Sequence, residues 1–543
     1  MDTDLRCTAG AVAEWGFSAR SADAATGHDT ELDVSVSSEA GQRWKVPAFW
    51  CGGSEWRVRF RPPAPGRYTW RTEATDKGDT GLHGVVGTLE AAADPAGPTG
   101  GTPSPRDPAI TVRADRFFSS DGRPFLWLGD TWWMGLCARW KWPEDFQLMC
   151  ADRQHKGFNV VQIVAGLYPD MPAFDPRGAN GAGFPWEKEW SRINPGWFNA
   201  ADQRIRWMVR CGIHPCIVGA WGYHLSWLGV RKMKRHWREI VARWAVYPVF
   251  WTLAGEATMP YYLSEHPEDD RKMQLAGWTE IGRYVKSIDP WHRPVSLHTA
   301  YGKDSRDEVE DPAVADFALV QGGNSGYFAQ QETVRIMKAS LGRAPAVPVV
   351  QAETCYEGAQ GTNSPDMVRF CFWSTWLSGI AGYTYGADGI WQASGKGAPY
   401  GPSPTGMAWG DCDWENAVNA PGSAQVAWGS AFLRALRWEQ MRPHQDWVSP
   451  AADDKSWFAP YAAGIAGRLR IVYYPVLTLS PWLWNRHLVT ALEPGVRYRA
   501  RLIDPRSGAE TDLGDVNGDA RGEWRVPCPP ISHDWLLVME ARA

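Results

Sequence analysis

The feature that most constrains this chain is an alternation of short apolar segments with helical stretches between residues 111 and 440. Each apolar segment has the length of a buried strand and is rich in β-branched and aromatic residues. Eight such units over about 330 residues predict an α/β fold, a (β/α)8 TIM barrel. The segments are FLWLGD (125–130), NVVQIV (159–164), HPCIVG (214–219), VFWTLAGE (249–256), PVSLHT (294–299), FALVQGG (317–323), PVVQAE (348–353) and GYTYGA (382–387).

A doubly wound open sheet is the alternative to a barrel. It would have fewer strands, or a glycine-rich phosphate loop after one of them, and the sequence contains neither GxGxxG nor GxxxxGK[ST]. The segments between the strands have helical character, with Pro at a first helical position in PEDFQLMCADRQHKGF and a terminating Gly in AADQRIRWMVRCG. The other predicted helices are RKMKRHWREIVARWA, RKMQLAGWTEIGRYVKSI, SPDMVRFCFWSTWLSGI and SAQVAWGSAFLRALRWEQM.

The regions on either side of the barrel have the pattern of β structure. Short alternating runs separated by Gly, Pro and Asp predict an immunoglobulin-like β-sandwich over residues 1–92. A stretch rich in Pro and Gly predicts a linker over 93–110. The barrel then occupies 111–440, and runs such as GRLRIVYYP and HDWLLVMEA predict a second β-sandwich over 441–543. Nothing in the flanking regions indicates separate chemistry.

Composition excludes several classes of protein. The chain has 56 basic and 61 acidic residues, so no basic excess is present to bind a nucleic-acid backbone. No stretch of about twenty apolar residues is present to span a membrane, and the first residues lack a secretory signal. The ten Cys form no CxxC pair or zinc-type spacing, so we expect them to be reduced. These features predict a cytoplasmic protein, although a mature chain whose signal had been removed would look the same.

Trp is unusually frequent, with 34 residues. An indole has an apolar face and a polar edge, and sugar rings stack on such faces. The alternative is that most of these side chains fill cores and domain interfaces. A cluster of Trp at the strand ends would favour carbohydrate binding.

The ends of the predicted strands carry the candidate chemistry, because catalytic groups of such barrels lie at the carboxyl ends of the strands. The fourth and seventh strands end in Glu256 and Glu353. A pair of carboxyl groups fits glycoside hydrolysis, and facing strands would hold the pair about 5–5.5 Å apart, which is the retaining geometry. The other strand-end side chains, which we expect to contact substrate, are Asp130, Trp132, Gln162, Trp221, His298, Gln321, Tyr356, Tyr385 and Trp391.

The neighbours of the two carboxylates predict their roles. Glu256 follows an apolar strand and two small residues, so burial would raise its pKa, as a general acid requires. Glu353 lies near Tyr356, whose hydroxyl would stabilise an ionised nucleophile. Either carboxylate could instead form a salt bridge or a helix N-cap. Glu357 competes with Glu353 for the second role, and the alternation of strand residues favours Glu353.

The strand-end motifs together resemble those of the apiosidase-like glycoside hydrolases. The motifs are FLWLGDTWW, KGFNVVQIV, AWG, FWTLAGE, QAETCYEG and AGYTYGADGIWQ, and the resemblance covers about residues 12–540. It implies a retaining (β/α)8 enzyme with Glu256 as acid/base and Glu353 as nucleophile. The positions that match the family near its site, and that the resemblance implies for substrate contact, are Asp130, Trp132, Gln162, Trp221, Tyr385 and Trp391.

The chain departs from this family at the acid/base. Relatives usually have Gly-Gly-Asp where this chain has Ala-Gly-Glu at 254–256, and Glu is one methylene longer. The resemblance implies a terminal apiose-like pentofuranosyl residue of a plant-derived glycoside or oligosaccharide as substrate. The departure leaves arabinofuranosides and pyranosides open. Because many relatives are secreted and no signal is seen, the expected supply is imported glycosides cleaved inside the cell.

Three other functions are compatible with parts of this pattern. A transglycosylase would share the same covalent intermediate, and a non-catalytic carbohydrate-binding protein would lack one carboxylate. A metal-dependent hydrolase on this barrel would need an HxH pair on the first strand, where this chain has Gly-Asp-Thr-Trp. Asp130 is equally compatible with a structural cap, and His298 with an ordinary core histidine. No cofactor or metal is implied, and the oligomeric state is not indicated.

Overall fold

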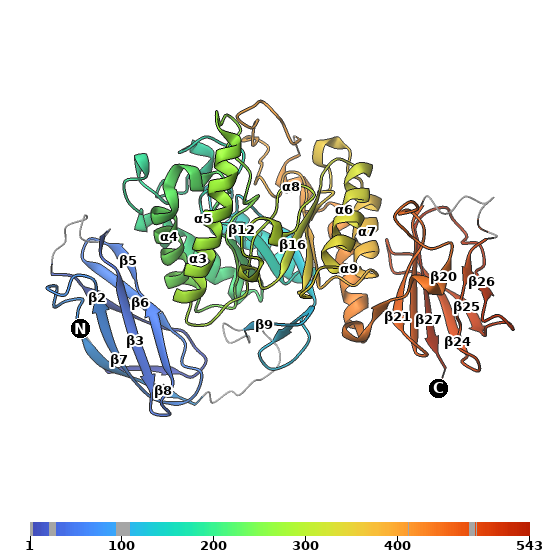
Figure 1. Cartoon of the computed structure of the whole chain (residues 1–543), viewed down its shortest axis with the longest axis horizontal. Coiled ribbons are helices and arrows are strands. Elements are labelled where there is room, and N and C mark those ends of the chain that lie inside the picture. Colours follow the sequence, from blue (N-terminus) through green and yellow to red (C-terminus); the bar gives the residue numbers. More distant parts are fainter. Residues whose placement is uncertain are drawn as a thin grey trace.

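The computed structural model describes residues 4–20, 29–93, 109–410, 412–476, 484 and 486–542. A parallel barrel lies in the middle of an elongated molecule, between two regions of β-sheet (Figure 1). The two termini lie in these outer regions, at opposite ends of the molecule (Figure 1). The predicted linker falls almost wholly outside the described residues, since its residues 94–108 are not among them.

All eight predicted strands are present and form one sheet in the order β15-β14-β13-β12-β11-β18-β17-β16. Between the outer two, the Ser296 hydroxyl donates to the carbonyl of Phe317 and the Asp316 amide donates to that of Val295, each over 2.7 Å. The sheet is therefore a nearly closed barrel, as predicted. Its strands are β11 (Trp127–Thr131), β12 (Val160–Val164), β13 (His214–Val218), β14 (Phe250–Thr252), β15 (Val295–Ser296), β16 (Ala318–Gly323), β17 (Val349–Thr354) and β18 (Gly382–Tyr385).

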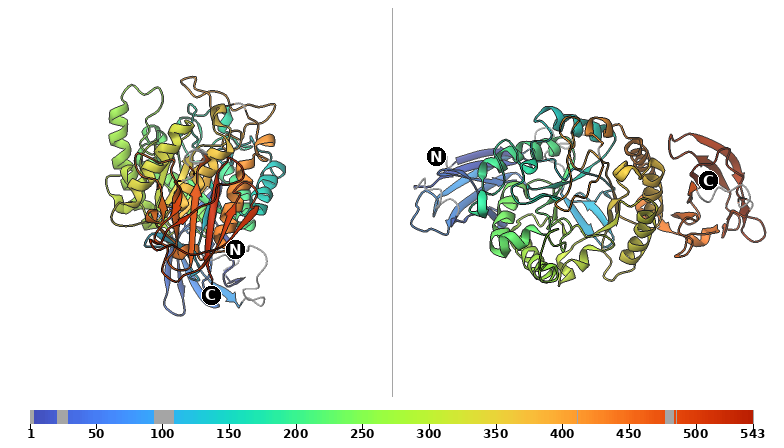
Figure 2. Two further views of the ribbon diagram at one scale, coloured as in Figure 1. Left: turned by 90° about the vertical axis from the view of Figure 1, so that its right-hand side faces the viewer. Right: turned by 90° about the horizontal axis from the view of Figure 1, so that it is seen from above.

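Helices surround the barrel, as the view from above shows (Figure 2). Their starts follow local rules: Pro195 occupies a first-turn position of α3, and the Asn194 side chain accepts a 3.0 Å hydrogen bond from the Gly196 amide. The predicted helices are present, and α6 and the four-residue α8 are additional ones. The helices are α2 (Glu144–His155), α3 (Pro195–Arg210), α4 (His224–Trp244), α5 (Pro267–Ile288), α6 (Tyr327–Leu341), α7 (Pro365–Trp376), α8 (Trp414–Ala417) and α9 (Pro421–Arg434).

A short antiparallel hairpin, β9 (Ile110–Arg113) and β10 (Arg116–Ser119), lies at one end of the barrel (Figure 1). Its Phe117 is fully buried, with ring centroids 5.7 Å from Trp127, 5.7 Å from Phe250 and 5.5 Å from Phe317. Burial of one such ring stabilises the fold by about 2–3 kcal/mol. The hairpin therefore closes the barrel where the strands begin, and access is left at the end where they finish.

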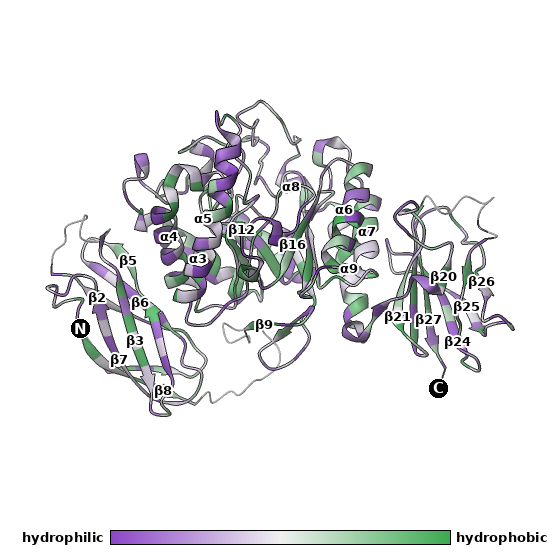
Figure 3. Ribbon diagram, viewed as in Figure 1, coloured by the Kyte–Doolittle hydropathy of each residue, from purple (hydrophilic) through white to green (hydrophobic). Residues whose placement is uncertain are grey.

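Most of the unusual Trp content that can be placed serves the core. Ten Trp side chains are less than 2% exposed, among them Trp237, Trp251 and Trp278. Hydrophobic residues run along barrel strands such as β12 and β16 (Figure 3). The frequency of Trp is thus explained largely by packing between the barrel and its helices.

The N-terminal region contains a five-stranded sheet, β1-β8-β7-β3-β4, and a three-stranded sheet, β2-β6-β5. Residues from both sheets share one hydrophobic core, which includes Trp15 and Phe17 from one and Val34 and Leu89 from the other. The strands are β1 (Asp4–Thr8), β2 (Ala13–Ser18), β3 (Leu32–Ser38), β4 (Arg43–Pro47), β5 (Phe49–Gly52), β6 (Glu55–Phe60), β7 (Gly66–Ala74) and β8 (Val86–Ala92).

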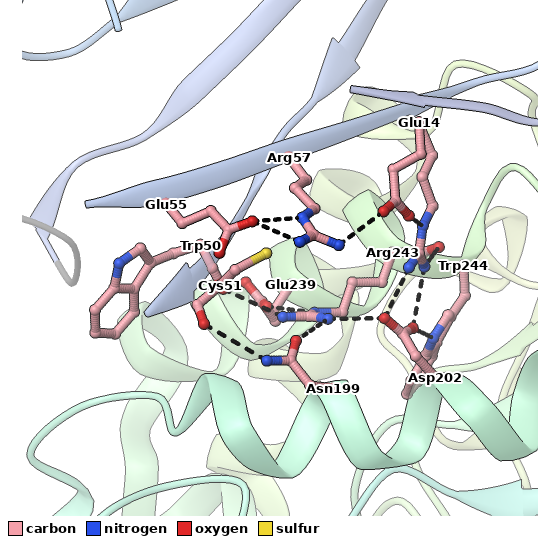
Figure 4. A network of polar contacts seen from close by, with 11 residues as sticks. Glu14, Trp50, Cys51, Glu55, Arg57, Asn199, Asp202, Glu239, Arg243 and Trp244 are labelled. Carbon is pink, nitrogen blue, oxygen red and sulfur yellow. Dashed lines mark hydrogen bonds and ion pairs between the residues drawn. The ribbon is translucent and has the colours of Figure 1, made fainter. Parts of the chain in front are cut away.

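A buried ion network joins this N-terminal region to the barrel (Figure 4). Arg59 of β6 donates to both carboxylate oxygens of Asp202 in α3, over 3.0 and 2.8 Å. Arg243 of α4 donates to Asp202 over 2.9 Å and to Glu239 over 2.6 Å. Burial alone would raise the pKa of Asp202, but the two guanidinium groups lower it to about 2. The carboxylate of Asp202 is therefore ionised and forms ion pairs with guanidinium groups from both sides of the interface.

The C-terminal region contains a six-stranded sheet, β19-β21-β22-β27-β24-β25, and a three-stranded sheet, β20-β23-β26. It is joined to the barrel at α7, where Arg369 forms two hydrogen bonds of 2.8 and 2.6 Å with Asp534. The strands are β19 (Arg442–Pro443), β20 (Val448–Ser449), β21 (Tyr461–Ile465), β22 (Leu469–Tyr474), β23 (Leu488–Val489), β24 (Tyr498–Ile503), β25 (Glu510–Val516), β26 (Trp524–Arg525) and β27 (Trp535–Ala541).

Candidate active site

A cavity of about 420 Å³ is lined by residues at and beyond the carboxyl ends of the barrel strands. Its size is within the range of small-molecule sites. Both predicted catalytic carboxylates line it. The predicted residues in its wall are Trp221, Glu256, Gln321, Glu353, Tyr356 and Trp391.

Glu256 reaches the cavity through an unusual backbone. Its φ of 42° lies in the left-handed region, which is strained for a residue with a side chain. The preceding Gly255 lies directly against the indole of Trp221, so a Cβ there would be 2.3 Å from the ring. Trp221 in turn donates to Oε2 of Glu256 over 3.3 Å, and Gln321 donates to Oε1 over 3.2 Å. Glycine is therefore required at position 255 by the close approach of Trp221, which also donates to the carboxylate of the next residue.

Glu353 is held by two shorter hydrogen bonds. The hydroxyl of Tyr356 donates to Oε2 and the amide of Asn324 donates to Oε1, each over 2.9 Å. The Tyr356 ring lies against Gly386, where a Cβ would come within 2.2 Å of it. The Nε2 atom of His298 lies 3.5 Å from Oε2 of Glu353. Burial lowers the pKa of His298 to about 3, so this ring is neutral at physiological pH.

The pKa values of both carboxyl groups are raised in the cavity. Burial, followed by the charge of Asp170, raises the pKa of Glu256 to about 7. Burial, followed by the charge of Glu256, raises the pKa of Glu353 to about 8. Two carboxyl groups that share one cavity do not readily ionise together, so the pair retains a proton near neutral pH. One protonated and one ionised carboxyl group is the combination needed for acid and nucleophilic catalysis.

The barrel region of the sequence matches a known protein family. A family model described as "Apiosidase-like, catalytic domain" matches residues 113–440. The chain belongs to the apiosidase-like family. A second model, a domain of unknown function called DUF5060, matches residues 11–75 in the N-terminal sheets. A search of curated proteins finds no match.

Solved structures similar to this apiosidase-like protein include glycoside hydrolases. One described as a glycoside hydrolase has a TM-score of 0.64 at 18% identity and covers 80% of this chain and 97% of its own. A family 5 glycoside hydrolase from Bacteroides vulgatus has a TM-score of 0.65 at 18% identity, covering 80% and 92%. Another Bacteroides vulgatus structure covers 100% of both chains with a TM-score of 0.65 at 16% identity. At sequence identities of 16–18%, the similarity to these structures establishes the fold alone.

Five predicted residues are not among the described residues that line the cavity: Asp130, Trp132, Gln162, His298 and Tyr385. Asp130 accepts hydrogen bonds of 2.7 Å from both Arg153 and the Trp132 indole. The Trp132 ring packs edge-on against Trp140, 5.2 Å away. Asp130 and Trp132 of this apiosidase-like protein thus support the cavity from behind instead of forming its wall.

Gln162 and Tyr385 also support the wall from behind. The Gln162 amide donates to the carbonyl of Ala352 over 3.0 Å, one residue before the candidate nucleophile. The Tyr385 hydroxyl donates to Glu357 over 2.6 Å, and the Gly422 amide donates to the same carboxylate over 3.0 Å. Glu357 is therefore engaged at the start of α9, and Glu353 is the carboxylate of this segment that lines the cavity.

Several cavity residues were not predicted. Asn324 directly follows strand six and Trp133 is the second residue after strand one, so the strand-end rule alone could have found them. The others lie on loops with no sequence signal that marks them, because their place depends on how distant segments pack. These additional residues include Asp170, Met259, Tyr262, Tyr301, Met407 and Trp409.

Two further observations concern metals and membranes. Across the described ranges, no group of three or more His, Cys, Asp or Glu residues is arranged to hold a metal ion. Among the helices of the same ranges, none is long and apolar enough to cross a membrane.

Proposed function

We propose that the protein is a retaining glycoside hydrolase that removes a terminal pentofuranosyl, apiose-like residue from a plant-derived glycoside or oligosaccharide. The observation that carries this proposal is that Glu256 and Glu353 line one cavity. Glu256 lies just beyond barrel strand four, and Glu353 lies near the end of strand seven. Membership of the apiosidase-like family supports the sugar class.

The proposed reaction has two steps. In the first, the protonated carboxyl group of Glu256 donates its proton to the glycosidic oxygen while a carboxylate oxygen of Glu353 attacks the anomeric carbon. The bond to the leaving group breaks and a covalent glycosyl ester forms. In the second, ionised Glu256 takes a proton from a water molecule, which attacks the same carbon and releases the sugar and the Glu353 carboxylate.

The hydrogen bonds support this division of roles. The donors to Glu353 lie 2.9 Å away, whereas those to Glu256 lie 3.2 and 3.3 Å away, and closer donors favour the ionised form. The pKa values of about 8 for Glu353 and about 7 for Glu256 have the opposite order. However, the charge of Glu256 is the second cause of the raised pKa of Glu353, and it disappears once Glu256 is protonated. A proton on Glu256 is therefore consistent with an ionised Glu353.

The aromatic wall supports a carbohydrate ligand. Trp133, Trp221, Trp391 and Trp409 all line the cavity, and indole faces stack on the apolar faces of sugar rings. The Trp133 and Trp221 rings meet edge to face at 5.5 Å, so they form a corner instead of a flat surface. Such a corner favours enclosure of one terminal residue.

The experiment is hydrolysis of a panel of apiosides, arabinofuranosides and common pyranosides by the wild type and by Glu353→Gln. We expect release of a pentofuranose that is lost in the variant. With Glu256→Ala, azide should restore turnover and give a glycosyl azide of retained configuration. An inverted azide product, or normal turnover by Glu353→Ala, would refute the assignment of roles.

A further inference from the structure

A third carboxylate, Asp170, lies in the wall of the catalytic cavity, and the proposed reaction does not use it. It belongs to the loop between β12 and α3. The residue is only 5% exposed, and the cavity is the space that it faces together with Glu256, Tyr262 and Trp409. A buried carboxylate beside the two catalytic ones is electrostatically unfavourable, so its presence calls for a function.

Four successive carbonyl groups around Asp170 accept hydrogen bonds from side chains, three of which come from other segments and one, Arg177, from the same loop. The Tyr223 hydroxyl donates to the carbonyls of Tyr168 (2.8 Å) and Met171 (3.2 Å), and Nε2 of His224 lies 3.0 Å from the carbonyl of Tyr168. The Tyr400 hydroxyl donates to the carbonyl of Pro169 over 3.0 Å. Arg177 Nη2 donates to the carbonyl of Asp170 itself over 3.4 Å. Tyr223, His224 and Tyr400 are buried, so this scaffold is rigid. It is the kind of support that keeps a functional group in place.

The backbone of Asp170 is also strained. Its φ of 56° is left-handed, a conformation that costs roughly 1 kcal/mol or more in a residue with a side chain. The surrounding hydrogen bonds hold it there. Strain that neighbouring structure maintains is found at functional sites, because it fixes the direction of a side chain.

The carboxyl group of Asp170 is partly engaged and has capacity for more. The Tyr262 hydroxyl donates to its Oδ1. A carboxylate accepts about four hydrogen bonds, so part of its capacity is left for a ligand. Burial raises the pKa of Asp170 to about 6, against the lowering effects of the Tyr262 hydroxyl, the Arg177 charge and the Trp409 indole. The ionised form therefore predominates at neutral pH, and a further donor would stabilise it.

One more polar group of the cavity wall lacks a partner. Among the described residues, Oε1 of Gln321 has no hydrogen-bond partner, although the atom is buried. Buried polar atoms are normally paired, so this atom points to a polar ligand. Together with Asp170 it supplies two acceptors around the same space, which suits the hydroxyl groups of a sugar.

We propose that Asp170 accepts a hydrogen bond from a hydroxyl group of the glycosyl residue being transferred, and thereby selects the sugar. This inference rests on the proposed function. Tyr262 orients the carboxylate from one side, and the strained loop directs it into the cavity. A sugar that lacks the hydroxyl group leaves a buried carboxylate without its donor, so it is rejected.

The test is the hydrolysis of a 4-nitrophenyl glycoside and its monodeoxy derivatives by the wild type and by Asp170→Asn. The glycoside is the one that the wild type hydrolyses fastest. For one deoxy position we expect the wild-type kcat/KM to fall by about ten- to a hundredfold, as for a hydrogen bond to a charged group. For that position alone, Asp170→Asn should hydrolyse the deoxy and the parent glycosides at similar rates. Glu187→Gln changes an exposed carboxylate of the same loop, paired with Arg192, and should behave as wild type.

The outcomes separate this inference from the proposed function. A wild type that hydrolyses no glycoside overturns both. An active wild type with the same deoxy penalties as Asp170→Asn at every position overturns only the role of Asp170. If Asp170→Asn does not fold, Tyr262→Phe should reduce the penalty at the same single position. A wild-type penalty below about threefold at every position overturns the inference without any variant.

Discussion

The raised pKa of Glu256 predicts that this candidate catalytic residue destabilises the protein at high pH. Its pKa is raised by burial from an ordinary 4.5 to about 7. The native state therefore keeps the proton at pH values where the unfolded chain has lost it. Stability falls as pH rises from about 4.5 and reaches its lower limit above about 7. Glu256→Gln, which is neutral at every pH, should remove this loss.

The size of the effect follows from the two pKa values. Each tenfold change in proton affinity is about 1.4 kcal/mol, so the full loss is about 3.5 kcal/mol above pH 8, and the part of it already present at pH 5 is about 1 kcal/mol. The Gln amide must face either Trp221 or Gln321 with its NH2 group, which costs about 1 kcal/mol at both pH values. The diagnostic quantity is therefore the difference between the two pH values, about 2.5 kcal/mol. For a barrel of about 330 residues this corresponds to about 4 °C in Tm.

The assay is thermal unfolding of the wild type and Glu256→Gln, followed by circular dichroism at pH 5 and pH 8.5. The variant should gain about 4 °C more at pH 8.5 than at pH 5. Loss of the Glu256 charge also lowers the pKa of Glu353, which acts in the same direction. Glu280→Gln, an exposed change on α5 at a residue paired with Lys234, is the control and should show no pH-dependent gain. An equal gain at both pH values, or a smaller one at pH 8.5, would refute the reasoning.

Three further changes have clear expected results. Gly255→Ala places a Cβ 2.3 Å from the ring of Trp221, so the indole must move away from the acid, and kcat should fall at least about tenfold with an unchanged circular dichroism spectrum. Tyr356→Phe removes a 2.9 Å donor to the nucleophile, which raises the pKa of that carboxyl group, so the acidic limb of the kcat/KM profile should move to higher pH. Asp202→Asn removes the carboxylate that the buried Arg59 and Arg243 share, which should cost about 3–5 kcal/mol and speed proteolytic release of the N-terminal region.

The barrel could be predicted from sequence because its signal is local. Each strand is buried on both faces, so it appears as a continuous apolar run between turn residues. The carboxyl ends of these runs also located Glu256 and Glu353. Even so, β14 ends at Thr252, and the three residues that follow it, before Glu256, are outside the regular strand. Their path depends on contacts with neighbouring strands, such as the 2.8 Å hydrogen bond from the Gly255 amide to the carbonyl of Ala220.

The strand-end rule predicts how far along the barrel axis a residue lies, but it does not predict whether its side chain faces the cavity. Trp132 and Trp133 are adjacent, yet Trp132 packs against Trp140 behind the cavity while Trp133 lines it. Successive residues of an extended chain point to opposite sides, so one residue of register decides which indole meets the ligand. Both residues lie beyond the end of β11, where strand alternation no longer applies, so the sequence alone does not predict which of them faces the cavity.

The position of Asp170 could not be predicted, since it depends on groups more than fifty residues away in sequence, such as Tyr223 and Tyr400. This has a consequence for specificity. The resemblance to the apiosidase-like family implies an Asp at the position of Glu256, and Glu is one methylene longer. A longer acid requires the leaving oxygen, and with it the sugar, to occupy a different place in the cavity. The groups that contact the displaced ring are then those of the wall, so differences in sugar preference within this family should follow the loop that carries Asp170 more closely than the motifs of the catalytic residues.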